Sequence, residues 1–328
     1  MLTAGKGILA IDETSPTCTK RFAEYGIEST EKSRRAYREM LVTTPGVGEY
    51  ISSAILFDET IRQTTSEGRP FVDALKARGI IPGVKVDTGA RPLANAPGET
   101  VTEGLDRLRE RLNEYGEAGA QFSKWRAVFN IGSALPSRYC IQANAHALGR
   151  YAALAQEAGV VPIVEPEVLM NGAHDINRCQ EVTEEVLLAV FEELADQHCL
   201  FEAMILKPNM VTPGRDSRIQ ADASEIAQLT LTTLRRCVPA AVPGIAFLSG
   251  GQSGEEACAN LNALVSRGNL PWQLGFSFGR ALQYPALQIW GGEGANVPAA
   301  QSAFLHRAKM SSLAQAGAYS TDLERTLV

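Results

Sequence analysis

The sequence predicts a (β/α)8 barrel formed by a single domain, residues 1–328. Eight short apolar or β-branched segments alternate with longer segments of helical period, a pattern typical of βα units and not of a sandwich. Charged or phosphate-binding residues follow seven of these eight segments, and this fold collects its functional groups at the carboxyl ends of its strands. An open sheet of six or seven strands is the alternative. It is disfavoured because the closely spaced glycines of a dinucleotide-binding turn are missing after the first segment.

The predicted strands are short apolar runs, as expected for strands buried on both faces. In chain order they are residues 7–11, 53–57, 83–86, 120–125, 161–164, 203–206, 244–248 and 273–277. The helices predicted between them have apolar residues at helical spacing, and several end at a glycine. They are residues 105–115, 143–159, 182–198, 224–236 and 254–268. No internal repeat or long linker interrupts this pattern, so one domain is expected.

The composition is that of an ordinary globular protein, with 45% of the 328 residues hydrophobic and 21% charged. The formal net charge of −6, with both signs interspersed, argues against a nucleic-acid surface and favours a small substrate. No apolar stretch approaches the roughly 20 residues that span a bilayer, and the N-terminus lacks a secretory signal. We therefore expect no membrane partner. The expected location is the cytoplasm, or the plastid stroma if a transit peptide has been removed.

The cysteines and histidines do not indicate a metal site. The six cysteines include no CxxC pair, and the four histidines are isolated from one another. Structural zinc sites usually show such ligands in close pairs along the sequence. We expect reduced structural cysteines, no metal ion and no other cofactor.

Three lysines, Lys85, Lys124 and Lys207, lie at the downstream ends of predicted strands. Lysine is rarely buried without a partner or a lowered pKa, and a desolvated amine beside another cation is a nucleophile toward carbonyl groups. Lys207 is the expected nucleophile, because it follows an apolar strand and precedes Pro208, where the chain is forced to turn. The alternative for each lysine is a stem that packs on apolar neighbours while the ammonium group reaches the surface.

Carboxylates accompany these lysines. Glu165 and Glu167 share one face of a predicted strand, as do Lys124 and Arg126. A carboxylate beside a Schiff-base lysine can carry protons during the reaction. Asp12 follows an apolar strand, so its carboxylate should be unusually basic unless a lysine pairs with it. The alternatives are an N-cap role for Asp12 and a structural ion pair of Lys124 with Glu165 or Asp12.

Two segments are typical of phosphate sites. In the first, a strand leads through Ser249 and Gly250 into an acid-rich helix, and backbone N–H groups at a helix start bind anions. The second supplies Ser277, Gly279 and Arg280 after the last strand, where this fold commonly builds a phosphate site. A plain glycine turn would explain either segment alone. Together they favour a phosphorylated substrate.

These motifs resemble those of the class I, Schiff-base fructose-bisphosphate aldolases. The resembling segments, in family order over essentially the whole chain, are GKGILAIDET, ILFDET, GVKVDTG, SKWRAV, VPIVEPEVL, LKPNMVTPG, GIAFLSGGQS and FSFGRALQ. Residues 42–65 and 306–320 resemble the bacterial and plastid members more than the animal ones. The resemblance implies metal-independent cleavage of fructose 1,6-bisphosphate in glycolysis, gluconeogenesis or the Calvin cycle. It also implies a homotetramer.

The resemblance further implies roles for individual residues. Lys207 would attack the C2 carbonyl of fructose 1,6-bisphosphate, and Glu165 would assist the loss of water. Asp12 would take the proton from the C4 hydroxyl, while Lys124 and Glu167 balance charge and orient the substrate. The resemblance places one phosphate at Ser249, Gly250, Ser277, Gly279 and Arg280. It places the other phosphate at Lys85, Thr14 and Thr17. Arg21 and Arg126 would be supporting cations.

The sequence departs from the family at several positions. Thr14 and Thr17 stand where serines are common and keep the hydroxyl, Thr88 replaces a common lysine, and Phe278 replaces a common tyrosine. In the animal members a tyrosine at the end of the tail helps to protonate the enamine. This sequence ends at Val328, so we expect another proton donor, either within this chain or in sequence beyond it.

Other functions are alternatives. A Schiff-base transaldolase, or an aldolase for another sugar phosphate, would need one phosphate site, whereas two are indicated here. A catalytically idle scaffold would keep the barrel for protein binding. The complete set of Asp12, Lys85, Lys124, Glu165 and Lys207 argues against that reading. A side activity on sedoheptulose 1,7-bisphosphate is left open, because loops determine the room for the extra carbon.

Overall fold

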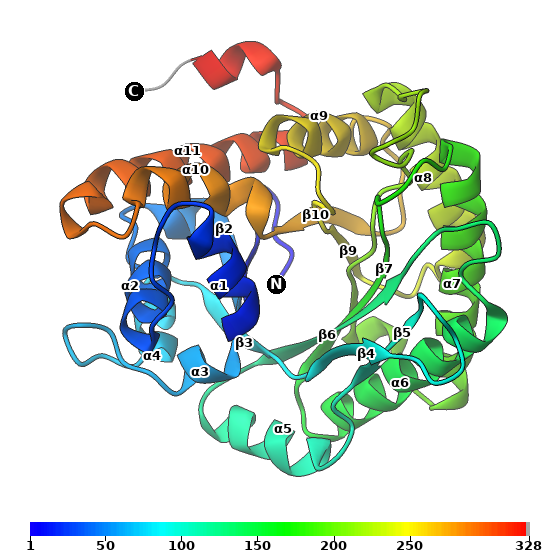
Figure 1. Ribbon diagram of the computed structural model, residues 1–328, viewed down its shortest axis with the longest axis horizontal. Coiled ribbons are helices and arrows are strands. Elements are labelled where there is room, and N and C mark those ends of the chain that lie inside the picture. The colour runs from blue at the N-terminus through cyan, green and yellow to red at the C-terminus, as the bar shows by residue number, and fades with distance from the viewer. Residues whose placement is uncertain (326–328) are drawn as a thin grey trace.

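The computed structural model describes residues 1–325, which form a closed barrel of parallel strands surrounded by helices (Figure 1). The barrel strands are β1 (Gly7–Ile11), β2 (Ile51–Leu56), β3 (Ile81–Lys85), β6 (Phe122–Phe129), β7 (Val161–Val168), β8 (Ile205–Leu206), β9 (Gly244–Phe247) and β10 (Gln273–Phe278). They pair in the order β1-β10-β9-β8-β7-β6-β3-β2, and β1 closes the ring by pairing with both β2 and β10. The predicted barrel is confirmed, and the open-sheet alternative is wrong because, among residues 1–325, each of the eight barrel strands pairs on both sides. Val328, where the sequence departs from the family tail, lies outside the described residues.

Two barrel strands continue well past their predicted carboxyl ends. β6 continues four residues past Trp125 and β7 four residues past Val164, with Arg126 opposite Glu165. Lys124 therefore lies in the middle of β6, and the prediction that it ends a strand is wrong. The pattern ended early because charged residues at alternate positions interrupt the apolar run. Their side chains nevertheless face the inside of the barrel.

An apolar layer fills the barrel below the carboxyl ends of its strands. It consists of Ile8, Ala10, Ile55, Phe122, Ile163, Ile205 and Ala246. Side chains alternate along a strand, so the residue two positions further on points into the barrel one step higher. The residues that follow Ala10, Phe122, Ile163 and Ile205 in this way are Asp12, Lys124, Glu165 and Lys207. The same alternation that builds the core therefore stacks a charged layer on an apolar floor.

The five predicted helices are present. They are α5 (Leu108–Glu117), α6 (Arg138–Glu157), α7 (Ile176–Asp196), α8 (Ala223–Cys237) and α9 (Gly254–Val265). Four of them begin at a polar N-cap whose side chain accepts a hydrogen bond from a backbone N–H three residues later: Ser137, Asp175, Asp222 and Ser253. Leu105, expected at the start of α5, precedes that helix. The intervening Arg107 has a φ of 53°, a left-handed conformation that a helix cannot include.

The sequence pattern did not indicate several elements. These are α1 (Ser15–Ala23), α2 (Glu31–Val42), α3 (Asp58–Ile61), α4 (Phe71–Lys76), α10 (Arg280–Trp290), α11 (Val297–Gln315), the 3-10 helices η1 (Val47–Glu49), η2 (Phe201–Ala203), η3 (Gly294–Asn296) and η4 (Thr321–Arg325), and the hairpin of β4 (Gly89–Pro92) and β5 (Thr100–Glu103). α10 and α11 lie side by side along one side of the barrel (Figure 1). α11 is buried around much of its circumference, so it lacks the single apolar stripe by which a surface helix is recognised.

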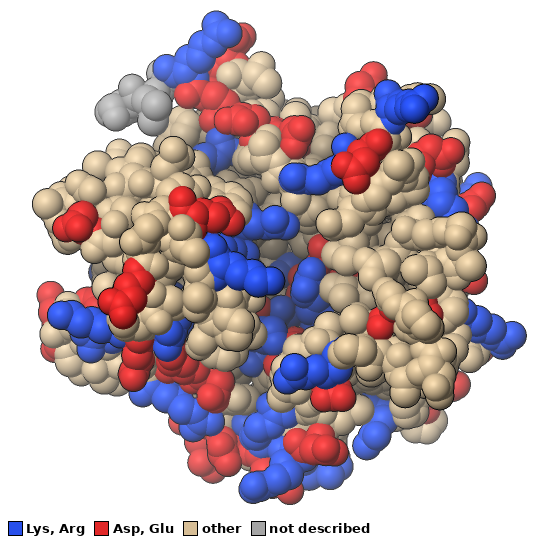
Figure 2. Space-filling model, viewed as in Figure 1, with Lys and Arg blue, Asp and Glu red and all other residues tan. Residues whose placement is uncertain are grey.

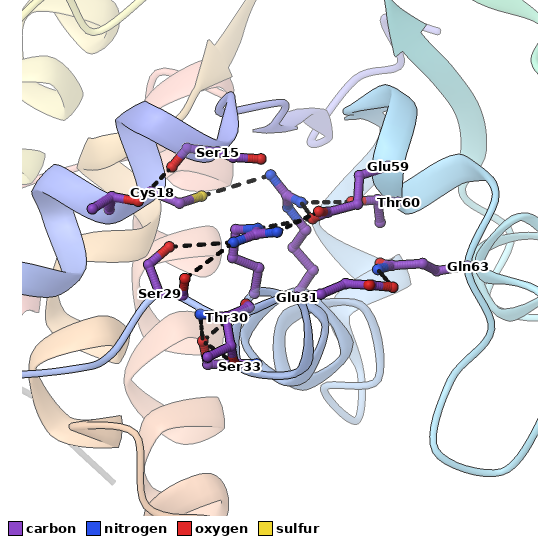
Figure 3. Close-up of polar contacts among 12 residues, drawn as sticks. Ser15, Cys18, Ser29, Thr30, Glu31, Ser33, Glu59, Thr60 and Gln63 are labelled. Carbon is purple, nitrogen blue, oxygen red and sulfur yellow. Dashed lines mark hydrogen bonds and ion pairs between the residues drawn. The ribbon is translucent and has the colours of Figure 1, made fainter.

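A fully buried arginine holds the turn that follows β1. Arg38 of α2 is 0% exposed, and its guanidinium donates to Thr60 Oγ1 at 2.7 Å and to the backbone carbonyl of Glu13. Glu59 Oε1 lies 3.3 Å from the same guanidinium and balances its charge. Figure 3 shows the contacts that Glu59 and Thr60 make in this network. Because Glu13 follows Asp12 directly, the network fixes the backbone that carries the Asp12 carboxylate.

We expect replacement of Arg38 by methionine to lower the free energy of unfolding by about 3 kcal/mol. The change removes a buried cation and leaves Thr60 Oγ1 and the Glu13 carbonyl without the guanidinium that donates to them, whereas Glu59 keeps its ion pair with Arg34. Denaturant unfolding followed by circular dichroism measures this. Lys32→Met, on the exposed side of the same helix, is the matched control and should change stability by less than about 0.5 kcal/mol. If Arg38→Met and Lys32→Met have the same free energy of unfolding, Arg38 does not hold this turn.

Candidate active site

The structure brings the predicted site residues together in one cavity of about 570 Å³ at the carboxyl ends of the barrel strands. Those expected to act in the chemistry are Lys207, Glu165, Asp12, Lys124 and Glu167. Those expected to bind substrate are Lys85, Arg126, Ser249, Gly250, Ser277, Gly279, Arg280, Thr14, Thr17 and Arg21. Figure 2 shows Lys and Arg side chains in and around the central hollow of a chain whose net charge is −6. Seven Lys and Arg side chains and six Asp and Glu side chains line the cavity, a slight positive excess in a chain that is negative overall, which suits an anionic ligand.

Four charged side chains form the floor of this cavity: Lys124, Glu165 and Lys207 are buried, and Asp12 is partly buried. Lys124 Nζ lies 2.6 Å from Asp12 Oδ2 and 3.0 Å from Glu165 Oε2, and Lys207 Nζ lies 3.1 Å from Glu165 Oε1. Glu165 thus bridges the two lysines with its two oxygens. Because Lys124 and Lys207 are buried, the surface-reaching alternative is wrong for both. The N-cap alternative for Asp12 is also wrong, since Thr14 occupies the N-cap position of α1.

The electrostatics of this cluster keep its carboxylates ionised. Burial alone raises the pKa of Asp12, but the positive charges of Lys124 and Lys207 outweigh it, so the pKa falls below its usual range. The pKa of Glu165 is lowered by the same balance of burial against these two lysines. Burial lowers the pKa of Lys124, yet the charges of Asp12 and Glu165 raise it above the ordinary lysine value. Asp12 was expected to be unusually basic only if no lysine paired with it. Lys124 pairs with it, so its pKa is lowered and not raised.

Two further ion pairs form the wall of the cavity. Lys85 at the end of β3 pairs with Asp87, and the pKa of Lys85 is lowered because its burial outweighs this partner. Arg126 Nε lies 2.6 Å from Glu167 Oε2, one step above the Lys124 and Glu165 pair on the same two strands. Asp87 also accepts a hydrogen bond from the backbone N–H of Arg126 at 3.2 Å. The ends of β3, β6 and β7 are thereby linked through charges.

The ends of β9 and β10 have the features of an anion site. Ser249 and Gly250 follow β9, and Gly250 adopts a φ of 56°, which favours glycine. Arg280 is the first residue of α10, so its charge adds to the positive end of that helix. Ser277 is 1% exposed, and within residues 1–325 its Oγ has no hydrogen-bond partner. A buried hydroxyl without a protein partner can donate to a ligand oxygen.

The residues of the β1–α1 turn contribute from the other side of the cavity. Thr14 Oγ1 and Thr17 Oγ1 are 3.0 Å apart and line the cavity together. Arg21 also lines it and forms an ion pair with Glu13. A phosphate that reaches this turn therefore finds two adjacent hydroxyls and a cation that is already held in place.

Several polar residues line the cavity to which the sequence analysis assigned no role: Glu13, Lys20, Glu24, Asp87 and Tyr284. A signal for two of them exists, because Lys20 and Glu24 follow Thr17 at helical spacing in α1. Tyr284 follows Arg280 by four residues in α10. Neither α1 nor α10 was predicted, so the sequence did not indicate in which direction the side chains of Lys20, Glu24 and Tyr284 point.

Comparison with known proteins identifies the family. The family model for fructose-bisphosphate aldolase class-I matches residues 1–327. The chain belongs to the class I fructose-bisphosphate aldolases. The probable fructose-bisphosphate aldolase class 1 of Xanthomonas axonopodis pv. citri is 55% identical over 97% of this chain and 95% of its own length. Cytosolic fructose-bisphosphate aldolase 4 of Arabidopsis thaliana is 53% identical over 98% of this chain and 82% of its own.

A solved structure agrees with this membership. The fructose-bisphosphate aldolase of Plasmodium falciparum, determined in complex with TRAP and a small-molecule inhibitor, superposes with a TM-score of 0.96 at 46% identity. The match covers 97% of this chain and 92% of that one. The predicted resemblance, the barrel fold and the aldolase activity are confirmed by these comparisons.

Class I fructose-bisphosphate aldolases are lyases that act on sugar bisphosphates through a lysine Schiff base and not through a metal. Among residues 1–325, no group of three or more His, Cys, Asp or Glu side chains is arranged to hold a metal ion. The relatives include bacterial proteins and plant and algal ones named cytosolic or chloroplastic. In the part of the chain that the structure describes, no helix is long and apolar enough to cross a membrane.

Proposed function

We propose that Lys207 is the Schiff-base lysine of this aldolase and that the 570 Å³ cavity cleaves fructose 1,6-bisphosphate reversibly. The observation that supports this is the position of its amine, buried on the cavity floor and 3.1 Å from Glu165 Oε1. An ammonium group must lose a proton before it attacks a carbonyl, and Glu165 is placed to accept that proton. Lys124 contacts the other oxygen of Glu165 and limits the change in charge.

The proposed reaction begins with addition of the Lys207 amine to C2 of the open-chain sugar. The resulting carbinolamine loses its hydroxyl as water, with a proton from Glu165, and becomes an iminium. Asp12 takes the proton of the C4 hydroxyl, and the C3–C4 bond electrons move to C3 as the iminium becomes an enamine. Glyceraldehyde 3-phosphate leaves at this point. Protonation at C3 and addition of water then release dihydroxyacetone phosphate and free Lys207. Lys124 and Glu167 balance charge and orient the substrate.

The strand order supports an assignment of the two phosphates. β8, which carries Lys207 at its end, is the neighbour of β9, which leads to Ser249. The C1 phosphate is attached next to the carbon that Lys207 attacks, so we place it at the ends of β9 and β10, with Ser249, Gly250, Ser277, Gly279 and Arg280. Lys85 lies on β3, across the barrel from β9 and β10. We place the C6 phosphate there with Thr14 and Thr17, supported by the charges of Arg21 and Arg126.

Borohydride reduction in the presence of dihydroxyacetone phosphate and a chelator tests this function. The hydride should convert the iminium into a stable secondary amine. We expect one adduct per chain on Lys207, detected by intact mass and located by peptide mapping. An adduct on Lys85 or Lys124 would assign the nucleophile elsewhere. Folded protein without any adduct would contradict the covalent mechanism and favour an idle scaffold.

We further propose a side activity on sedoheptulose 1,7-bisphosphate. The catalytic cavity adjoins a second cavity of about 1290 Å³, and Thr14, Lys85, Asp87, Gly89 and Ala90 line both. This shared wall lies where the C6 phosphate is proposed, so an extra carbon has room to extend. Release of dihydroxyacetone phosphate from the seven-carbon substrate measures this activity. A rate no higher than that of a Lys207→Met variant would rule it out.

The assembly, location and domain limits are proposals as well. By analogy with its family we propose a homotetramer in the cytoplasm or plastid stroma, and light scattering during size-exclusion chromatography measures the assembly. Relatives named cytosolic and chloroplastic support the location.

We also propose that residues 1–328 fold as one unit. The packing of α11 against α9 and α10 supports this, because it ties the C-terminal part of the chain to the barrel.

A further inference from the structure

A tyrosine in the catalytic cavity has no role in the reaction described above. Tyr284 lies in α10, four residues after Arg280, and both side chains line the 570 Å³ cavity. Residues four apart share one face of a helix, so the phenol and the guanidinium point to the same region. Neither the expected chemistry nor the expected phosphate sites included Tyr284.

The neighbour of Tyr284 fixes the direction in which it points. Gln283 is 1% exposed, donates to the backbone carbonyl of Ala10 in β1 and accepts a hydrogen bond from Tyr37 at 2.9 Å. Consecutive helical residues are rotated by about 100°, so Gln283 locked against β1 and α2 turns Tyr284 toward the cavity. Trp290 at the other end of α10 packs on Phe22 of α1, with ring centroids 5.9 Å apart. α10 is therefore packed against β1, α2 and α1 on either side of Tyr284.

Charged side chains surround Tyr284 in the cavity. The cations are Lys20, Arg21 and Arg280, and the carboxylates are Glu13 and Glu24. A neutral phenol is a hydrogen-bond donor that adds no charge to such a cluster. Its complement is an anion with several acceptor oxygens.

We propose that the Tyr284 hydroxyl donates a hydrogen bond to the C1 phosphate that Arg280, Ser249 and Gly250 hold. This inference rests on the proposed function, because it uses the phosphate assignment made there. It adds a determinant of substrate binding on α10. The C1 phosphate keeps its charge throughout the reaction, so this contact stabilises substrate and transition state equally and acts on KM and not on kcat.

Steady-state kinetics of Tyr284→Phe test the proposal, because this change removes a single hydroxyl. We expect the KM to rise about tenfold for both fructose 1,6-bisphosphate and fructose 1-phosphate, with kcat within about twofold of the wild type. Both substrates should respond because both carry the C1 phosphate. Tyr139→Phe, at a tyrosine of α6 that is 51% exposed, is the matched control and should leave both KM values unchanged.

Each other outcome overturns the proposal. Unchanged KM values would show that the phenol does not contact substrate, and a rise for fructose 1,6-bisphosphate alone would assign it to the C6 phosphate. A fall in kcat without a change in KM would assign it to the chemistry. Thermal unfolding of the variant confirms that it is folded. Failure of the proposed function is distinguishable, because the wild type itself would then give no adduct with dihydroxyacetone phosphate.

Discussion

Replacement of Lys207 by methionine is expected to lower kcat by about four orders of magnitude or more. The change removes the amine that forms the iminium, and no other step of a covalent mechanism can then proceed. Methionine has a similar length and suits the apolar layer beneath it, while Lys124 still pairs with Glu165. The variant should therefore fold normally. A coupled assay for triose phosphates measures the activity, and circular dichroism with thermal unfolding checks the fold.

A control separates loss of this amine from loss of any lysine. Lys309→Met removes an exposed lysine of α11 and should keep wild-type activity and stability. Turnover of Lys207→Met above about 1% of the wild type would show that the covalent mechanism is wrong. An unfolded Lys207→Met protein would leave the test to borohydride trapping on the wild type, which needs no substitution.

Replacement of Asp12 by asparagine is expected to lower kcat by about 10²- to 10⁴-fold, the usual contribution of a general base. The amide nearly matches the carboxylate in shape but cannot accept the proton of the C4 hydroxyl. Schiff-base formation depends on Lys207 and Glu165, so borohydride should still trap dihydroxyacetone phosphate on this variant. Trapping without cleavage would locate the defect at the step that breaks the C3–C4 bond. If the variant lost both trapping and cleavage, Asp12 would instead be assigned to imine formation.

The same substitution has an effect on stability that depends on pH. Asp12→Asn leaves Lys124 with only Glu165 as its partner, so we expect a loss of about 2 kcal/mol at pH 7. The pKa of Asp12 is lowered in the folded state, so its stabilising effect is fully present above the unfolded pKa of about 4 and is lost as the pH falls further. The difference in the free energy of unfolding between the variant and the wild type should therefore become smaller at acid pH. Denaturant unfolding at pH 7 and below pH 4 measures this, with the exposed Asp196→Asn as control.

The strand pattern was the most informative part of the sequence, and its failures have physical reasons. Apolar runs located all eight barrel strands, because each strand lies between an apolar interior and a helix. The same rule made the predicted ranges of β6 and β7 too short, because Lys124 and Glu165 occupy inward positions that usually hold apolar residues. α11 escaped because it is buried on several sides, and α1 because it is short. Two cavity residues, Lys20 and Tyr284, lie on helices that were missed.

The sequence by itself determined the fold class, the family and the set of charged residues at the strand ends. Residue type and order along the chain are sufficient for these, because strand periodicity and motif spacing are local. Only the tertiary structure decided which charges meet. Asp12 and Lys124 are far apart in the chain and come within 2.6 Å because β1 pairs with β10 and closes the ring. Burial and the opposite charges that it brings together then set the pKa of each group, and both are properties of the closed barrel that no segment of the sequence contains.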